Sequence, residues 1–220
     1  MDDASTAAKL KSVYERLFEC YGPQHWWPAE TPFEVMVGAV LTQSAAWSNV
    51  EKAIANLKAA GELSAAALRQ ISIDELARLV YPSGYYNAKA KKLKALVAWL
   101  GRYGDDLSQI ESRNAGDLRR ELLAVHGIGP ETADSILLYA LGKPVFVIDA
   151  YTRRLFSRLG IRPPKDTYDG WRKLFSNNLP LDSAVFNEYH ALIVRHGKEK
   201  CRVSPQCAKC CLGEKCPERG

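Results

Sequence analysis

The chain has 220 residues, of which 47% are hydrophobic, so it is long enough for one large or two small packed domains and too apolar for a disordered protein. Its net charge is +5, and lysine and arginine gather in short clusters, which suits a polyanionic partner as well as a solvated surface. No apolar run approaches the roughly 20 residues of a membrane helix, and the acidic start MDDAS differs from a secretion signal, so we expect a cytosolic protein.

The spacing of apolar residues is helical along almost the whole chain. Helices are predicted, in chain order, over residues 5–20, 32–43, 47–59, 64–70 and 73–80, over the basic segment after the turn at 81–87, over both segments that flank HGIG, from Asp149 onward, and over 168–178 and 182–196. Two of them follow serines typical of N-caps, Ser64 and Ser72. The run VFVI at 145–148 is β-like, but with helices on both sides it serves as a connector. The sequence therefore predicts an all-α fold.

Two glycines, Gly127 and Gly129, mark the turn within HGIG. Glycine lets the backbone come close to a ligand and adopt positive φ, so the amides of Gly127, Ile128 and Gly129 can point at one phosphate. Pro130 then suits the first turn of the next helix, whose N-terminus attracts an anion. The pattern indicates a helix–hairpin–helix over about residues 117–141 that binds DNA without reading its sequence. The alternative is an ordinary turn between two helices with a glycine cap.

Asp149, in VIDAYTRRL, precedes a predicted helix. Aspartate is among the best N-caps, and that structural role alone accounts for the residue. The role is compatible with catalysis, because a carboxylate at a helix N-terminus stays ionised, as it must to stabilise a developing sugar cation or to orient a water.

Five of the six cysteines crowd the last 20 residues, whereas Cys20 stands alone. Four have the spacing Cys-x5-Cys-x2-Cys-x5-Cys, and a fifth, Cys211, lies among them. In a reducing cytosol such clustered cysteines indicate a metal site rather than disulfides. Four thiolates suit a [4Fe–4S] cluster or a zinc ion, and the spacing leaves both open.

Together, LLAVHGIGPETA, VIDAYTRRL and the four-cysteine loop resemble the endonuclease III superfamily of helix–hairpin–helix DNA glycosylases, over essentially the whole chain. The 3-methyladenine glycosylase branch is the most similar, through WWP at 26–28, GAVLTQ at 38–43, PSGYYNAKAKKL at 82–93 and GIGPETADSILLYA at 127–140. The loop has one residue fewer between its first two cysteines than is usual in endonuclease III, and the alkylpurine branch in its best-known form lacks the cluster. The chain therefore combines features of two branches.

The resemblance implies two helical domains that flank a DNA-binding cleft. One would be a helical barrel over residues 23–143 that includes the hairpin, and the other would join 1–22 to 144–220. The implied partner is double-stranded DNA that contains damaged bases. We expect a monomer, without membrane attachment, in the cytoplasm and associated with the nucleoid.

The resemblance also implies that the loop 201–216 holds a [4Fe–4S] cluster on its spaced cysteines, Cys201, Cys207, Cys210 and Cys216. Structural zinc is the alternative, and Cys211 is an alternative ligand to Cys210. The cluster is expected to shape a basic loop that contacts DNA, without redox turnover.

Bifunctional members of the superfamily have a lysine in the second hairpin helix, and its amine attacks the sugar C1′ to form an imine. This sequence has Glu131 there. A carboxylate cannot form an imine, so we expect a monofunctional glycosylase without lyase activity, with water as the nucleophile and Asp149 as the catalytic carboxylate. Glu131 itself either lines the substrate pocket or is an acidic residue that favours the first turn of its helix.

The damaged base must leave the stack before it is cut. Gln43 resembles the family residue that fills the gap in the duplex, and a capping or surface glutamine is the alternative. Trp26, Trp27 and Trp47, with Pro28 beside them, hold the positions that pack around the flipped base in the alkylpurine branch. Alkylation makes a purine cationic, and a tryptophan face attracts a cation by roughly 0.5–2 kcal/mol. Otherwise these aromatic residues belong to the core.

Lys198, in HGKEK, occupies the position of a pocket lysine in the alkylpurine branch, and contact with a phosphate is the alternative. Three lysines that follow PSGYYN, Lys89, Lys91 and Lys92, are interpreted as contacts to the DNA backbone or as a solvated face. The expected function is hydrolysis of the N-glycosidic bond of alkylated purines such as 3-methyladenine, in base excision repair. The alternatives are a glycosylase for oxidised pyrimidines or mismatched bases, and a non-catalytic iron–sulfur protein that binds DNA.

Overall fold

The computed structural model describes residues 3–218, and their backbone is helical or irregular, with no strand. The all-α prediction is confirmed. The chain divides into two compact units, of which one is Trp27–Lys143 and the other joins Met1–Trp26 to Pro144–Gly220. Within the described residues no helix is both long enough and apolar enough to cross a bilayer.

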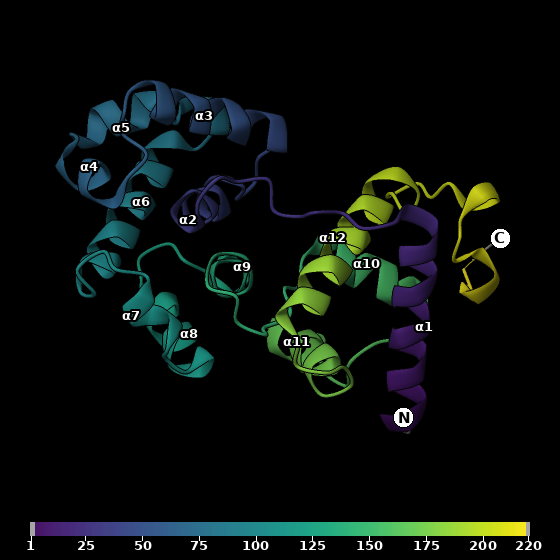
Figure 1. Ribbon diagram of the computed structural model, residues 1–220. Coiled ribbons are helices and arrows are strands. Elements are labelled where there is room, and N and C mark those ends of the chain that lie inside the picture. Colours follow the sequence, from purple (N-terminus) through teal and green to yellow (C-terminus); the bar gives the residue numbers. More distant parts are fainter. Residues whose placement is uncertain (1–2, 219–220) are drawn as a thin grey trace. The chain divides into compact units, whose positions relative to one another are not determined.

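The unit Trp27–Lys143 holds the hairpin (Figure 1). Its elements are α2 (Pro32–Leu41), α3 (Trp47–Ala59), α4 (Ala65–Gln70), α5 (Ile73–Leu79), the 3₁₀ turn η1 (Tyr81–Ser83), α6 (Tyr86–Gly101), α7 (Ser108–Glu111), α8 (Ala115–Leu123), α9 (Pro130–Ser135) and the π turn η2 (Ile136–Ala140) that continues α9. The predicted caps are confirmed, since the Ser64 and Ser72 side chains accept hydrogen bonds from the amides of Ala67 and Glu75. The short helix α7 was not predicted.

Helix α6 packs against α4 and α5 and carries the basic segment KAKKLK (Figure 1). Lys89 is only 1% exposed, so the expectation that it contacts DNA or solvent is wrong. Its ammonium donates to the carbonyl oxygens of Leu41 at 2.8 Å and Ser83 at 2.6 Å, at the ends of α2 and η1. Burial, together with the nearby charge of Lys92, lowers the pKa of Lys89 to about 8.

The other unit is built from both ends of the chain. It contains α1 (Asp3–Tyr21), α10 (Ala150–Arg158), α11 (Tyr168–Ser176), α12 (Ser183–Glu199) and the 3₁₀ turns η3 (Cys207–Lys209) and η4 (Gly213–Lys215). Helix α12 packs against α1 and α10 (Figure 1). The Tyr189 hydroxyl donates a hydrogen bond to the Leu10 carbonyl at 2.7 Å. The connector VFVI is buried, and Phe146 within it stacks on Phe175 with ring centroids 3.9 Å apart. Asp149, at the start of α10, therefore directly follows a segment that is buried in the core.

Candidate functional site

The two glycines of the hairpin between α8 and α9, Gly127 and Gly129, have different roles. Gly127 has φ +77°, which favours glycine, and an added Cβ there would clash with Cγ of Lys92. Gly129 is extended, with φ −89°, and a Cβ there would meet nothing within 4 Å. The Ile128 side chain is buried, and its amide donates to the Val125 carbonyl at 3.1 Å. Gly127 is therefore required by the fold, whereas the open space beside Gly129 is available to a ligand.

A buried ion pair holds the two hairpin helices together. Arg119 in α8 places Nε 2.6 Å from Oδ1 of Asp134 in α9, and Asp134 is fully buried. Removal of the guanidinium would leave a buried carboxylate without its countercharge, which typically costs about 3–5 kcal/mol. The pair therefore fixes the angle at which α9 leaves the turn.

Gln43, just after α2, lies against the hairpin. Its Nε2 donates to the Gly127 carbonyl at 3.2 Å and to Oγ1 of Thr132 at 2.9 Å. A polar recess of about 240 Å³ adjoins it, lined by Ala39, Thr42, Gln43, Ser44, Glu131, Thr132 and Ser135. The structure thus brings together Gln43 and Glu131, which the sequence singled out from segments 88 residues apart.

The predicted aromatic residues fall into two groups. Within Trp27–Lys143, Trp27 packs edge-on against Trp47 with centroids 5.3 Å apart, and it also contacts Tyr139 at 5.2 Å. Pro28 beside it is exposed. Trp26 belongs to the other unit, where Nζ of Lys198 lies 5.9 Å from its ring centroid.

Asp149 caps α10, as its place in the sequence predicts. Its Oδ1 accepts hydrogen bonds from the Thr152 amide at 2.7 Å and the Thr152 hydroxyl at 2.9 Å, while Oδ2 lies 3.5 Å from Nε2 of His190 in α12. Burial by itself would raise the pKa of Asp149, but the charge and hydrogen bond of His190 and the two bonds from Thr152 outweigh it, so the pKa lies below the usual value. The site therefore maintains an ionised carboxylate at a helix N-terminus.

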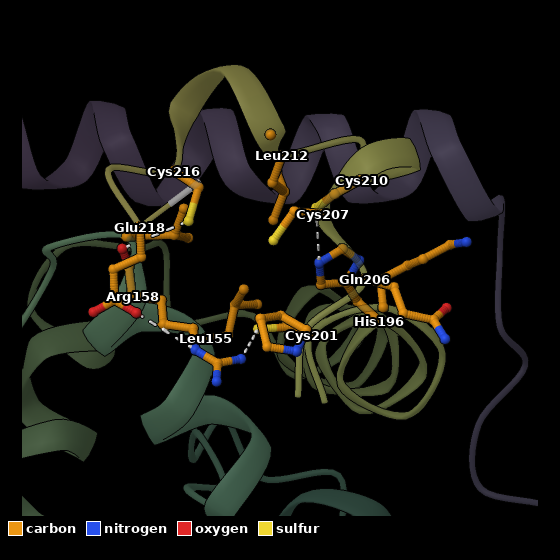
Figure 2. Close-up of a pocket in the computed structure, with 14 residues that line it drawn as sticks. Leu155, Arg158, His196, Cys201, Gln206, Cys207, Cys210, Leu212, Cys216 and Glu218 are labelled. Atoms are coloured by element: carbon orange, nitrogen blue, oxygen red, sulfur yellow. Dashed lines mark hydrogen bonds and ion pairs between the residues drawn. The ribbon is translucent and has the colours of Figure 1, made fainter. Parts of the chain in front are cut away.

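Four cysteines surround a cavity of about 270 Å³ beside α10 and α12 (Figure 2). These are the four spaced cysteines, Cys201, Cys207, Cys210 and Cys216. Cys211 is not among the lining residues, and its thiol hydrogen-bonds that of Cys20 in α1. Arg158 of α10 donates to the Cys201 sulfur at 3.3 Å and to the Arg202 carbonyl at 2.6 Å, which anchors the loop.

Comparison with known proteins identifies the family. Residues 37–181 match the model of the HhH-GPD superfamily base excision DNA repair proteins. The chain belongs to this superfamily. It is a DNA glycosylase of base excision repair, with the helix–hairpin–helix that gives the superfamily the first part of its name.

Three proteins are similar to this chain over most of its length. A Methanocaldococcus jannaschii protein with the provisional name of a DNA repair glycosylase is 47% identical over 94% of this chain and 95% of its own. The structure of H. pylori 3-methyladenine DNA glycosylase bound to 1,N6-ethenoadenine is 30% identical, with a TM-score of 0.75 over 90% of this chain and 98% of that one. A trapped covalent endonuclease III–DNA intermediate is 22% identical, with a TM-score of 0.82 over 97% and 96%, and shows the shared fold.

Four thiols line the cysteine cavity of this HhH-GPD protein, a donor set that suits a metal cluster or a single metal ion. A [4Fe–4S] cube holds four thiolates at its separate corners, around a space such as this cavity. N–H donors to the sulfurs, such as Arg158, also suit anionic ligands.

Sequence reasoning missed two residues that contact predicted site residues. His190 reaches Asp149 from a helix that begins 34 residues later, and a histidine within an apolar helix gives no local signal. Tyr139 contacts Trp27 from the turn that continues α9, where an aromatic residue is usually core. Both contacts depend on how the helices pack.

Proposed function

We propose that this DNA glycosylase hydrolyses the N-glycosidic bond of alkylated purines, with Asp149 as the catalytic carboxylate and water as the nucleophile. The observation that carries the proposal is the ionised state of Asp149, and in addition the sequence has a carboxylate, Glu131, where bifunctional relatives have an amine. The 30% identity to a protein named 3-methyladenine DNA glycosylase supports the substrate class.

Asp149 acts on the sugar. The bond between C1′ and the purine nitrogen breaks, and its electron pair leaves with the base. The negative Oδ2 stabilises the positive charge that develops on the sugar. Water then forms the new bond to C1′ and releases a proton to the surrounding solvent, which leaves an abasic site. Because Oδ1 is bonded to Thr152, the carboxylate keeps one orientation throughout the step.

An alkylated purine suits this arrangement because it carries a positive charge. Its charge makes it a good leaving group, so the step needs no strong acid. The indole faces of Trp27 and Trp47 would attract the cationic base, and the Tyr139 ring contacts Trp27. Trp26, with Lys198 beside it, is proposed to contact the same base or its phosphate.

The four-cysteine loop is proposed to hold a [4Fe–4S] cluster on Cys201, Cys207, Cys210 and Cys216. When bound, the cluster would shape the loop, with no electron transfer in the glycosylase step. Gly127 and Gly129 are proposed to receive a phosphate through their amides, and Ile128 to anchor the turn in the core.

The test is base release from methylated DNA by the wild type, Asp149→Asn and Asp182→Asn. Asp182 caps α12 by accepting hydrogen bonds from the amides of Ala184 and Val185. Asparagine is an equally good cap, so Asp182→Asn controls for the loss of a capping carboxylate. We expect 3-methyladenine release by the wild type and Asp182→Asn, a reduction of roughly a hundredfold to a thousandfold in Asp149→Asn, and strand breaks only after alkali.

Two results would contradict the proposal. Release of thymine glycol or mismatched thymine, without release of any methylated purine, would assign another substrate class. A borohydride-stable adduct between the wild type and its substrate would show an amine nucleophile in place of water.

A further inference from the structure

Helix α6 contacts the segment around Gln43 at two places. Lys89 and Lys92, one helical turn apart, donate to the Leu41 carbonyl at 2.8 Å and to Oε1 of Gln43 at 2.5 Å. The neighbouring Lys91 is exposed. The basic run therefore has an inner face that fixes the end of α2 and an outer face toward solvent.

The Gln43 amide is hydrogen-bonded on both sides. Its nitrogen donates to Gly127 and Thr132, and its oxygen accepts from Lys92. An ammonium only donates, so Lys92 can bond only the amide oxygen and thereby selects one of the two amide orientations. The side chain is fixed in place and in direction.

Lys92 also packs against the hairpin at Gly127. A Cβ at Gly127 would come within 2.7 Å of three of its methylene carbons, Cγ, Cδ and Cε. The aliphatic stem thus packs on the turn while the ammonium holds Gln43. Ordering a lysine costs side-chain entropy, and a charge-assisted hydrogen bond together with this packing offsets that cost.

We infer that Lys92 is a positioning residue for DNA engagement, one that holds the Gln43 side chain against the hairpin so that both meet the duplex in a fixed arrangement. The inference rests on the proposed role of Gln43 in filling the gap left by the extruded base. Without Lys92, Gln43 would sample several rotamers, and insertion would carry the cost of ordering it.

The test uses a duplex with a tetrahydrofuran abasic-site analogue opposite 2-aminopurine. This probe needs no base release, so it is independent of the proposed substrate class. Dissociation constants and the change in 2-aminopurine fluorescence are measured for the wild type, Gln43→Ala, Lys92→Met, Lys91→Met and the double variant Gln43→Ala/Lys92→Met. Methionine keeps the stem that packs on Gly127, and thermal unfolding confirms that each variant is folded.

We expect Lys92→Met to weaken binding about tenfold, the size of one lost charge-assisted hydrogen bond, and to reduce the fluorescence change. Lys91→Met loses the same charge but should keep the fluorescence change. The double variant should bind like Gln43→Ala alone, because Lys92 acts through Gln43.

Equal effects of Lys92→Met and Lys91→Met, or multiplicative effects in the double variant, would overturn the inference and reduce Lys92 to a general charge. If Gln43→Ala binds DNA more weakly but Lys92→Met binds it like the wild type, the inference is overturned and the role of Gln43 stands. An unimpaired Gln43→Ala would refute both.

Discussion

His190 Nε2 lies 3.5 Å from Oδ2 of Asp149, on the oxygen that Thr152 does not bond. The two residues come from α12 and the start of α10, so helix packing sets the carboxylate's charge state. Because the charge and hydrogen bond of His190 lower the pKa of Asp149 against the effect of burial, replacement of His190 leaves only the Thr152 hydrogen bonds to oppose burial. We expect His190→Leu to raise the pKa of Asp149 and move the acid limb of base release to higher pH. A pH–rate profile measures this, and an unchanged acid limb would contradict it.

The two hairpin glycines should respond differently to alanine. Gly127→Ala introduces a Cβ at positive φ and against Lys92, so we expect a loss of stability of about 1–3 kcal/mol. Gly129→Ala meets no protein atom and should leave stability unchanged, yet it fills the space proposed for a phosphate. Denaturation and DNA-binding curves separate the effects. Full DNA binding by Gly129→Ala would place the phosphate elsewhere.

Introduction of an amine in α9 should change the chemistry. We expect Glu131→Lys to form a borohydride-trapped adduct with damaged DNA, whereas the wild type and Glu131→Gln form none. A lysine in the first turn opposes the helix dipole, so the variant should be slightly less stable, by about 0.3–1 kcal/mol. Gel analysis after borohydride treatment detects the adduct. Trapping by Glu131→Gln would indicate another amine.

Because of Lys89, the free energy of unfolding should change with pH in the alkaline range. Its folded-state pKa is about 8, below its unfolded value, so the charged form destabilises the folded protein. This destabilisation is fully present below pH 8. It disappears as the pH rises to about 10.5, where Lys89 also loses its proton in the unfolded state. The free energy of unfolding should therefore rise between these two pH values. Relative to Lys89→Met, the gain is up to roughly 3 kcal/mol at 1.36 kcal/mol per pKa unit. Denaturation at several pH values tests this, with Lys91→Met, which keeps Lys89, as the control that should show the same gain as the wild type.

The two adjacent cysteines of the loop should differ in metal binding. Cys210 lines the cavity, whereas the Cys211 thiol bonds Cys20. We expect Cys210→Ser to lose iron and visible absorbance, and Cys211→Ser to retain both. Iron loss in Cys211→Ser alone would make Cys211 the ligand.

The sequence predicted elements and residues whose signal is local. The Asp149 cap and the serine caps followed from residue type and position, and the cysteine spacing indicated a metal loop. Contacts between distant segments could not be predicted from the sequence. The inward direction of Lys89 depends on two carbonyl groups at helix ends, which KAKKLK does not encode. His190 was missed for the same reason, because only the packing of α12 on α10 brings it to Asp149.

The unit that carries Asp149 contains helices from both sides of Trp27–Lys143 in the chain. On the ribosome, α1 emerges early but must wait for α12 before its main partner exists, since the Tyr189 hydroxyl bonds the Leu10 carbonyl. Residues 27–143 can fold in the interval, because domains generally fold as units during synthesis. A nascent chain would thus form the hairpin between α8 and α9 before α12 packs beside Asp149.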